Sequence, residues 1–495
     1  YQERGMSTTT TTTWETVIGL ETHVELATTT KLFCGCPNEF GAEPNTNICP
    51  VCLGLPGSLP VLNERAVEFA LRVGEALHCD VPEHSIFHRK NYFYPDMPKD
   101  YQVSQYDEPI CVDGWLEVDG DRIGVERAHM EEDTGKTLHV GGGGRIHEAS
   151  HSLVDYNRAG VPLMEVVSRP DLRSAEQARA YVGELRALLE AIGVSDVKME
   201  EGSFRIDANV SLRPAGADEL GTKVEIKNMN SLRSLGRALE FEVERQRRLL
   251  ESGERIVQET RHWDEEEGVT HGMRTKEGSE DYRYFPEPDL VPVSPDAAMR
   301  ERVRAGLPEL PAARRSRLVE QWGITDHEAR VLTGTPGLAE YAEAAVVALD
   351  GGTANDVVKW CTGEVLGFLH ETGSAPGALP LAPDGLAELI GLVADGTLSR
   401  NLAKDVLDEC LREPKRPRQV VDERGLAQVS DENELTTLID GIVADSPDEV
   451  ERYRAGDDKA KKKLRGFFMG KAMQATENKA NPQLLTRLLK ERLEP

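Results

Sequence analysis

The sequence predicts an α+β protein that has a sheet in its first part and helices in the rest. Polar and apolar residues alternate in several strand-like segments before residue 295. Apolar residues then recur at helical spacing from about Leu307 to Leu411, and again toward the C-terminus. We therefore expect four parts: a disordered tail (1–15), a sheet domain (16–295), a helical domain (296–412) and a helical tail domain (413–495).

Composition restricts the kind of protein. The 495 residues, 39% of them hydrophobic and 29% charged, suit about three soluble globular domains. No apolar run approaches the ~20 residues that span a bilayer, and no signal peptide is visible. Eight cysteines in a chain of this length do not indicate a secreted disulfide scaffold, so we expect a cytoplasmic protein without membrane contact.

The charge is strongly acidic but uneven. A net charge of −28 argues against nucleic-acid binding by the whole surface. Residues 459–495, in contrast, contain ten Lys and Arg against three Glu. This basic end could contact a phosphate backbone, or it could be a merely soluble helix pair.

The first strand, predicted over Val17–Leu26, has one polar face. Side chains alternate along a strand, so Glu21, His23 and Glu25 project to the same side. Two carboxylates around an imidazole suit a hard divalent cation with bound phosphate oxygens. A solvated face of a half-buried strand is the alternative.

The next segment, 34–52, carries four close-spaced cysteines. Cys34 and Cys36 are followed, after twelve residues, by Cys49 and Cys52. This spacing predicts a tetrahedral Cys₄ zinc site, and four thiolates leave no position open for a substrate. The site would therefore be structural. Reduced buried cysteines and a redox CxxC are the alternatives.

Two further segments are candidates for the site. Residues 88–105 combine four aromatics, two prolines and several basic residues, which suits either a substrate loop or an ordered surface loop. Arg89, Lys90 and Lys99 would then lie near anionic groups. The strand that follows ends in the acidic triplet 131–133. Three adjacent carboxylates repel one another unless cations neutralise them, so this triplet is either a metal site or a solvated turn.

A helix and two polar strands complete the first domain. Ser174 with Gln177 three residues later predicts a helix start, and Gly193 suits its end. Strands at 204–212 and 222–228 each present a polar face. Those faces could simply meet solvent, or they could offer carboxylates to cations and ammonium groups to phosphates. Their residues are Arg205, Asp207, Asn209 and Ser211 on one strand, and Lys223, Glu225 and Lys227 on the other.

The sequence lacks several well-known catalytic motifs. No Gly-x-Ser-x-Gly elbow, Walker lysine loop or Rossmann fingerprint occurs in the expected context. The acidic strands that remain fit metal-assisted phosphoryl transfer, in which catalysis is mostly positioning and charge neutralisation.

Several long motifs together resemble one family. The segments IGLETHVEL, RKNYFYPDMPK, AHMEEDTGK, DYNRAGVPLMEVVS, VKMEEGSFRIDANVSLR, EIKNMNS and DYRYFPEPD are similar to the B subunit of the tRNA-dependent amidotransferase, GatCAB. The resemblance extends from Thr16 to the C-terminus. It implies an antiparallel-sheet, glutamine synthetase-like catalytic (cradle) domain, an all-α middle domain and an all-α YqeY-like tail that contacts tRNA.

The resemblance also implies an activity. ATP would phosphorylate the side-chain carboxylate of Glu-tRNA(Gln) or Asp-tRNA(Asn), and ammonia from a glutaminase subunit would displace the phosphate. Whether Gln or Asn is the product depends on which misacylated tRNA the organism makes. Amidase (A) and small C subunits would be the partners. A non-catalytic tRNA-binding scaffold and a free-standing glutamine synthetase-like ligase are the rival interpretations.

The family's site residues fall on named positions of this chain. The implied catalytic residues are Glu21, His23, Glu132, Asp207 and Glu225, of which Glu21, His23 and Glu132 would bind Mg²⁺. Glu131 is a neighbour of these residues, and from the polar strand faces we expect it to contact ATP together with Lys223, Lys227 and Arg205. Lys90 lies in the motif that, by the resemblance, would line the ammonia path. The cysteine quartet is present in only part of the family, so zinc is predicted here from its spacing. For tRNA binding we expect the tail lysines Lys461, Lys462, Lys463, Lys471 and Lys479.

Overall fold

The computed structural model describes residues 13–141, 149–275, 279–426, 432–476, 480 and 482–494. The chain forms two compact units, residues 1–313 and 314–495, which are considered separately. Most of the predicted N-terminal tail, residues 1–12, lies outside the described part of the chain. Among the described residues, no helix is long and apolar enough to cross a membrane.

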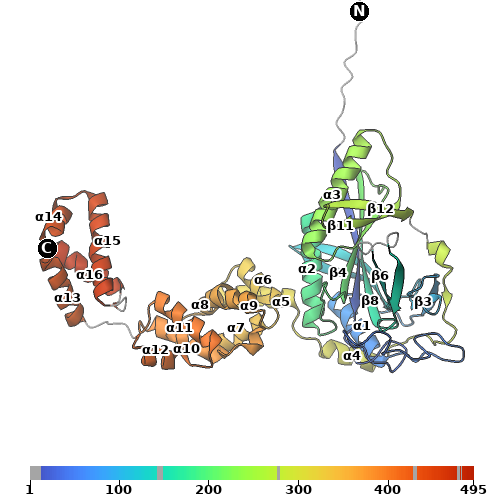
Figure 1. The fold of residues 1–495 in the computed structure, drawn as a ribbon, viewed down its shortest axis with the longest axis horizontal. Coiled ribbons are helices and arrows are strands. Elements are labelled where there is room, and N and C mark those ends of the chain that lie inside the picture. The colour runs from blue at the N-terminus through green and yellow to red at the C-terminus, as the bar shows by residue number, and fades with distance from the viewer. Residues whose placement is uncertain are drawn as a thin grey trace, which may run out of the picture. The chain divides into compact units, whose positions relative to one another are not determined.

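The first unit is built on an eight-stranded sheet (Figure 1). Every neighbouring pair of its strands is antiparallel except β10 and β11, which are parallel. In spatial order the strands are β12 (Val269–Thr275), β11 (Glu259–Asp264), β10 (Val224–Lys227), β9 (Phe204–Pro214), β1 (Trp14–Glu25), β8 (Pro162–Ser168), β5 (Asp121–Glu132) and β4 (Cys111–Val118).

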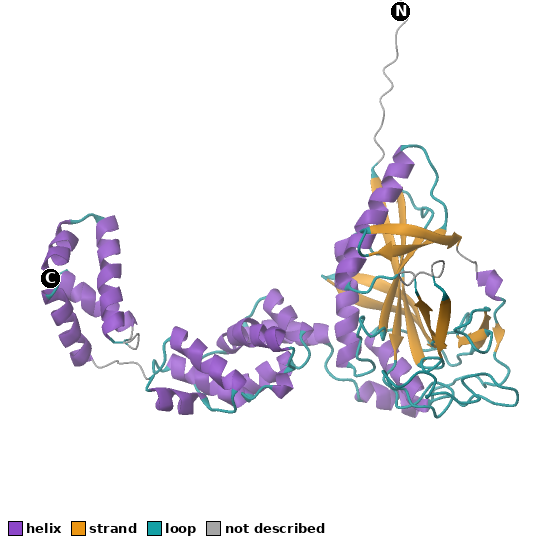
Figure 2. Ribbon diagram, in the orientation of Figure 1, coloured by secondary structure: helices purple, strands orange, loops and turns teal. Residues whose placement is uncertain are grey.

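Three helices cover one face of this sheet, as Figure 2 shows in purple beside the orange strands. They are α1 (Glu64–Ala76), α2 (Ala175–Ala191) and α3 (Leu232–Glu251). Ile18, Leu20 and Val24 of β1 are buried in the core with leucines of α2 and α3. The alternation along β1 therefore directs Glu21 and His23 to the opposite face.

The predicted helix signals are confirmed. The Ser174 side chain accepts a hydrogen bond from Gln177 N and caps α2. Gly193 follows this helix with φ +68°, a left-handed conformation that glycine adopts without strain. Sequence chemistry thus sets both ends of α2.

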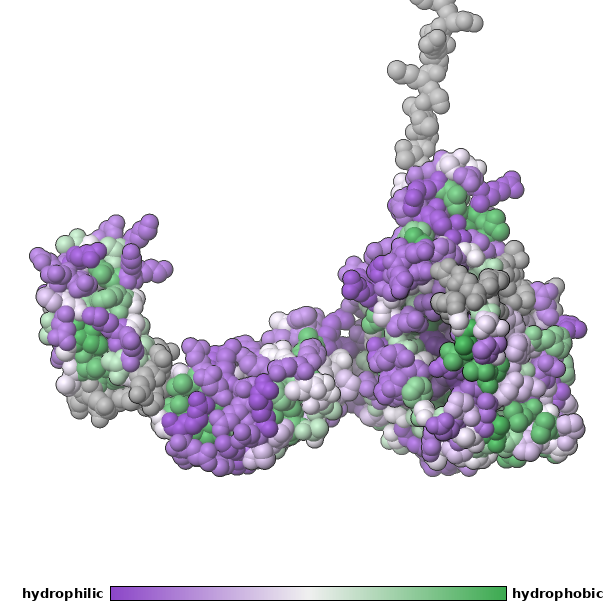
Figure 3. Space-filling model, in the orientation of Figure 1, coloured by the Kyte–Doolittle hydropathy of each residue, from purple (hydrophilic) through white to green (hydrophobic). Residues whose placement is uncertain are grey.

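Smaller elements complete the first unit. Strand β2 (His88–Asn91) lies between β3 (Tyr101–Ser104) and β13 (Phe285–Pro286), so it joins the two aromatic segments. A separate hairpin contains β6 (Lys136–Val140) and β7 (His151–Asp155). A 3₁₀ turn (Ser279–Tyr282) and α4 (Ala297–Ala305) follow. This unit also exposes large apolar side chains, among them Phe93 and Tyr94, and Figure 3 shows green patches on it.

The second unit is helical and has two hydrophobic cores. The first core uses α5 (Pro311–Trp322), α6 (Asp326–Gly334), α7 (Leu338–Val347), α8 (Ala354–Trp360), α9 (Leu366–Thr372), α10 (Pro383–Ala394), α11 (Arg400–Arg412) and α12 (Pro417–Arg424), with a π turn (Cys361–Val365) and a 3₁₀ turn (Pro376–Ala378). Val420 and Val421 pack in this first core, so α12 belongs to it although it follows the predicted boundary at residue 413. The second core uses α13 (Glu432–Ala444), α14 (Pro447–Ala455), α15 (Asp458–Ala475) and α16 (Pro482–Leu493).

Candidate active site

Strand register brings the polar side chains of the sheet together. β1 is central, and it pairs with β8 on one side and β9 on the other. Glu21 lies opposite Asp207, and His23 lies between Glu165 and Arg205. Residues far apart in sequence therefore share one face of the sheet.

One group on this face can hold a cation. Single ligand atoms of His23, Glu131 and Glu165 all lie within 4.8 Å of one another. His23 Nε2 is 3.9 Å from Glu131 Oε1 and 3.8 Å from Glu165 Oε2. A second imidazole, that of His129, lies 3.1 Å from Glu165 Oε2. The group thus combines two carboxylates with nitrogen donors.

The charges around this group keep Glu165 ionised. Burial alone would raise the pKa of Glu165, but the neighbouring His129 and His23 hold that pKa well below its usual range. Lys90 is also near: burial disfavours its charge, yet Tyr284, Glu131 and Glu165 raise its pKa above the ordinary value. The Lys90 ammonium lies 5.0 Å from the centre of the Tyr282 ring. Lys90 is therefore a cation beside two carboxylates.

A second group lies on the neighbouring strands. Ligand atoms of Glu21, Asp207 and Glu225 are again within 4.8 Å of one another. The Lys227 ammonium pairs with Asp207 and lies 3.5 Å from Glu225 Oε1. Burial would lower the pKa of Lys227, but Asp207 and Glu225 raise it. Lys227 therefore stays charged and neutralises part of the group.

These residues fit the cation that the sequence predicts. The donors are carboxylates and an imidazole, and carboxylate oxygens are ligands that Mg²⁺ accepts. In addition, Asn209 Oδ1 is buried near Glu21 and has no hydrogen-bond partner among the described residues. An unpaired buried oxygen beside three carboxylates suits a cation.

Glu132 is not brought to either group. It is adjacent to Glu131 and so projects from the other side of β5. Its carboxylate accepts a 2.8 Å hydrogen bond from Val103 N and pairs with the Lys99 ammonium. Both of these charged side chains are buried, and they line a cavity of about 70 Å³ together with Cys34 and Cys52. Glu131, and not Glu132, lies with His23.

The other predicted nucleotide-binding residues are placed differently. Arg205 Nη2 lies 2.6 Å from Asp133 Oδ2, so this guanidinium has a buried carboxylate partner. Lys223 is exposed just before β10. Arg205 and Lys227 are thus tied to acids of the polar face, whereas Lys223 is at its solvent edge.

Comparison with known proteins identifies the family. A family model described as the GatB/GatE catalytic domain matches residues 16–301, and one described as the GatB domain matches residues 340–493. The B subunit of the aspartyl/glutamyl-tRNA(Asn/Gln) amidotransferase of Moorella thermoacetica is 53% identical over 97% of this chain and 100% of its own length. Its counterpart in Synechococcus elongatus is 50% identical over 97% of this chain and 98% of its own length, and that of Frankia casuarinae is 52% identical over 97% and 96%.

The chain belongs to the GatB family. This confirms the resemblance found in the sequence, and with it the α+β class with a mostly antiparallel catalytic domain and a helical C-terminal region. Members of the GatB family are subunits of an ATP-dependent ligase of translation that forms Gln-tRNA(Gln) or Asn-tRNA(Asn), so this chain is part of such an amidotransferase.

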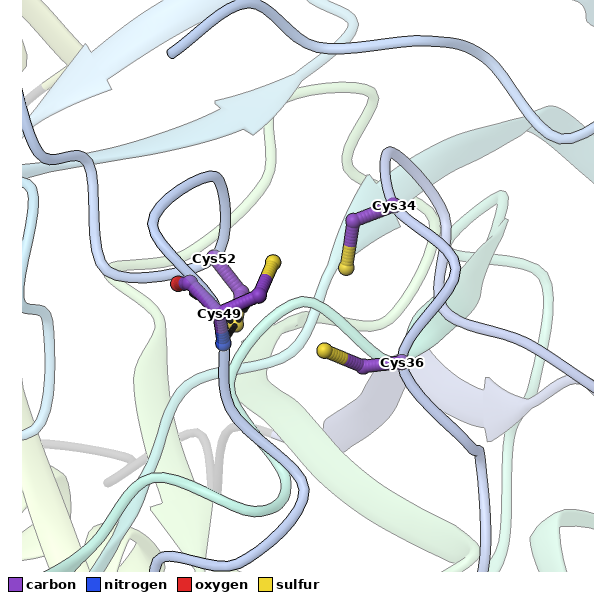
Figure 4. Close-up of side chains that lie close together, drawn as sticks. All are labelled: Cys34, Cys36, Cys49 and Cys52. Carbon is purple, nitrogen blue, oxygen red and sulfur yellow. Dashed lines mark hydrogen bonds between the residues drawn. The ribbon is translucent and has the colours of Figure 1, made fainter.

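This GatB chain also gathers its four N-terminal cysteines. Figure 4 shows Cys34 and Cys36 on one loop and Cys49 and Cys52 on another, with their side chains facing one another. The four sulfur atoms lie within 4.8 Å of one another. A hydrogen bond from Cys34, with further help from Cys49 and Lys31, lowers the pKa of Cys52 to about 5, although burial opposes this. A preformed thiolate among converging thiols could bind a metal such as zinc.

Four of the five predicted tRNA-binding lysines lie on α15. Lys462, Lys463 and Lys471 are exposed, and Lys461 is half-buried. Lys471 Nζ donates to Ser446 Oγ at 2.9 Å and lies 4.8 Å from the centre of the Phe467 ring. Lys479 lies outside the described residues.

Two residues of the face were missed by sequence reasoning. Glu165 lies in the apolar segment PLMEVVS, which indicates a packing strand, and His129 stands two positions before the acidic triplet. One signal was available: a single carboxylate in a strand whose other members are apolar or small is costly to bury without a partner. That partner is now seen to be His129.

Proposed function

We propose that the polar face of the sheet carries the ATP-dependent half of the amidotransferase reaction. The observation that supports this is the presence on one face of two groups that could hold a cation, His23 with Glu131 and Glu165, and Glu21 with Asp207 and Glu225. We assign Mg²⁺ to these groups, with Glu131 in the place that the sequence suggested for Glu132. When bound, the metal would neutralise phosphate charge on the nucleotide.

The reaction requires two displacements at the amino-acid side chain. First, a side-chain carboxylate oxygen of the Glu or Asp that tRNA carries attacks the γ-phosphorus of ATP. The bond from this phosphorus to the β-phosphate oxygen breaks, and ADP leaves. Then ammonia attacks the acyl carbon, the bond between that carbon and the phosphate oxygen breaks, and inorganic phosphate leaves. The nitrogen loses one proton, which is balanced on the leaving phosphate, and the amide results. The protein's part is to position anions and balance their charge, which suits a face that carries both carboxylates and fixed cations.

Basic residues at the rim would hold the nucleotide. Lys227, which pairs with Asp207, would contact phosphate oxygens, and Lys223 would do so from the solvent edge. Arg205 is held by Asp133, so we assign it to the wall of the site, where it supports the bound nucleotide. Lys90, next to Glu131 and Glu165, would lie where the ammonia path reaches the face.

The remaining parts complete the assembly that we propose. The sheet domain would have the glutamine synthetase-like fold, with a structural zinc ion at Cys34, Cys36, Cys49 and Cys52. The tail would be YqeY-like and would hold tRNA through its lysines (Lys461, Lys462, Lys463, Lys471 and Lys479). An amidase subunit would supply ammonia, a small C subunit would join it, and the complex would act in the cytoplasm. The predicted boundary near residue 15 would separate the tail from the catalytic part. The catalytic part would extend past residue 295 through α4, and the tRNA-binding part would begin after α12, beyond residue 412, because each of these helices packs in the core that precedes it.

A substitution on the face tests this proposal. Asp207→Asn in the assembled complex should abolish formation of amidated tRNA and tRNA-dependent ATP cleavage, because it removes one charge from the cation group. Binding of misacylated tRNA should be unchanged. Asp218→Asn, the same change in an exposed turn, is the control. A normal amidation rate in the Asp207→Asn complex would favour the non-catalytic scaffold instead.

A further inference from the structure

Asn209 on β9 has one side-chain atom bonded and the other unsatisfied. Its Nδ2 donates a 2.9 Å hydrogen bond to Glu21 Oε1. Its Oδ1 is buried and has no hydrogen-bond partner in the described parts of the chain. Buried polar atoms in folded proteins nearly always have a partner, so this oxygen needs an explanation.

The orientation of the amide follows from its bond to Glu21. Reversing the amide would place Oδ1 against a carboxylate oxygen, and both atoms accept hydrogen bonds without having a proton to donate. Only the observed orientation pairs a donor with an acceptor. Oδ1 is therefore directed away from Glu21 Oε1 and stays without a donor.

The neighbours of Asn209 offer it no hydrogen-bond donor that the structure records. It lies opposite Glu225 in the strand register, two residues from Asp207 on the same face. Each carboxylate of this group already has its own donor: Asn209 for Glu21, Lys227 for Asp207, and Thr260, at 2.7 Å, for Glu225. Four acceptor side chains thus meet on adjoining strands, and a cation between them would satisfy Asn209 Oδ1, the one oxygen of these four side chains that is buried without a partner among the described residues.

We propose that Asn209 Oδ1 is a fourth ligand of the cation held by Glu21, Asp207 and Glu225. Amide oxygens bind hard divalent cations alongside carboxylates. The Nδ2 bond fixes both the amide and Glu21, so two ligands are oriented before the cation arrives. This inference rests on the proposed function, because the cation is the one assigned there.

Binding of Mn²⁺, followed by electron paramagnetic resonance and calorimetry on the assembled complex, tests this role. The site in question is the one that Asp207→Asn abolishes. Asn209→Ala should weaken Mn²⁺ binding there roughly 10- to 100-fold, the usual effect of losing a residue that supports a metal. Asn209→Asp, which keeps the oxygen and loses the NH₂ group, should bind Mn²⁺ at least as tightly as the wild type.

A matched control comes from the helical unit. Asn355 also has a buried Oδ1 without a partner among the described residues, but it lies in the helical unit, whereas the metal-capable groups of the described chain all lie in the first unit. Asn355→Ala should therefore leave Mn²⁺ binding unchanged. If Asn209→Ala does not fold, as judged by circular dichroism, Asn209→Leu replaces it, because leucine matches the shape of the amide without its oxygen.

The outcomes separate the two proposals. Wild-type affinity in Asn209→Ala would overturn the ligand role while leaving the metal site in place. If Asn209→Asp also binds Mn²⁺ weakly, the hydrogen bond from the NH₂ group to Glu21, and not the oxygen, supports the cation. This result would also overturn the ligand role of Oδ1. A wild-type complex that binds no Mn²⁺ on this face would refute the metal assignment itself, and the inference with it.

Discussion

Replacing Glu25 by Gln should remove a pH-dependent loss of stability from the sheet unit. Glu25 ends β1, and its carboxyl group shares a hydrogen bond with the buried Asp133. Burial and the charge of Asp133 raise the pKa of Glu25 to about 8. Arginines beside Asp133 hold its pKa at about 2 against the effect of burial. At neutral pH the pair therefore carries one proton.

The size and sign of the effect follow from these values. A group whose pKa is higher in the folded than in the unfolded state stabilises the fold at low pH. This stabilisation is lost as the pH rises from the unfolded-state pKa to the folded-state pKa. For Glu25 these limits are 4.5 and about 8. Each unit of difference is worth about 1.36 kcal/mol, so the free energy of unfolding should fall by at most about 5 kcal/mol across this window. Gln keeps a donor toward Asp133 and has no proton to lose, so this fall should disappear.

Guanidinium unfolding between pH 5 and 8 measures the difference. Hydrogen exchange of β1 and β9 amides, read by mass spectrometry, reports the sheet unit separately from the helical cores. Glu117→Gln, an exposed change on β4 of the same sheet, is the control and should follow the wild type. If the free energy of unfolding changes equally with pH in the wild type and in Glu25→Gln over this range, the reasoning is refuted.

Three further outcomes are expected. Replacing Cys49 and Cys52 by Ser should remove one equivalent of zinc, measured by plasma mass spectrometry; full zinc content in that variant would exclude the cysteine site. Lys99→Met should lower the free energy of unfolding by roughly 3–5 kcal/mol in chemical denaturation, because it leaves the buried Glu132 without its cation, and a change under ~1 kcal/mol would contradict the pairing. Ending the chain at residue 431 should weaken filter binding of misacylated tRNA, most at low salt, while the glutaminase activity of the complex persists; undiminished tRNA affinity would rule out the tail lysines.

The faces of single strands could be predicted from the sequence. Alternation alone placed Glu21 and His23 together on β1, and Asp207 with Arg205 on β9, and both assignments agree with the structure. Local chemistry likewise predicted the start of α2 at Ser174. These features depend only on neighbours in the chain, so a sequence without its relatives suffices for them.

Contacts between strands could not be predicted in this way. Nothing local in PLMEVVS says that β8 pairs with both β1 and β5, which is what sets Glu165 between His23 and His129. Alternation requires Glu131 and Glu132 to lie on opposite faces of β5, but it does not say which of the two faces carries the group with His23 and Glu165. That choice depends on the register of β5 against β8, a property of the folded sheet.

The apolar face of the sheet therefore decides the geometry of the polar one. A one-residue slip of β1 against β9 would turn His23 and Glu21 into the core and expose Leu20 and Val24. Those two side chains are almost fully buried against helices of the first unit, and each such burial is worth about 1.5–3 kcal/mol. The slip is thus opposed by several buried residues at once. The same leucines and valines that hold α2 and α3 on the sheet keep carboxylates from separate strands close enough to share a cation.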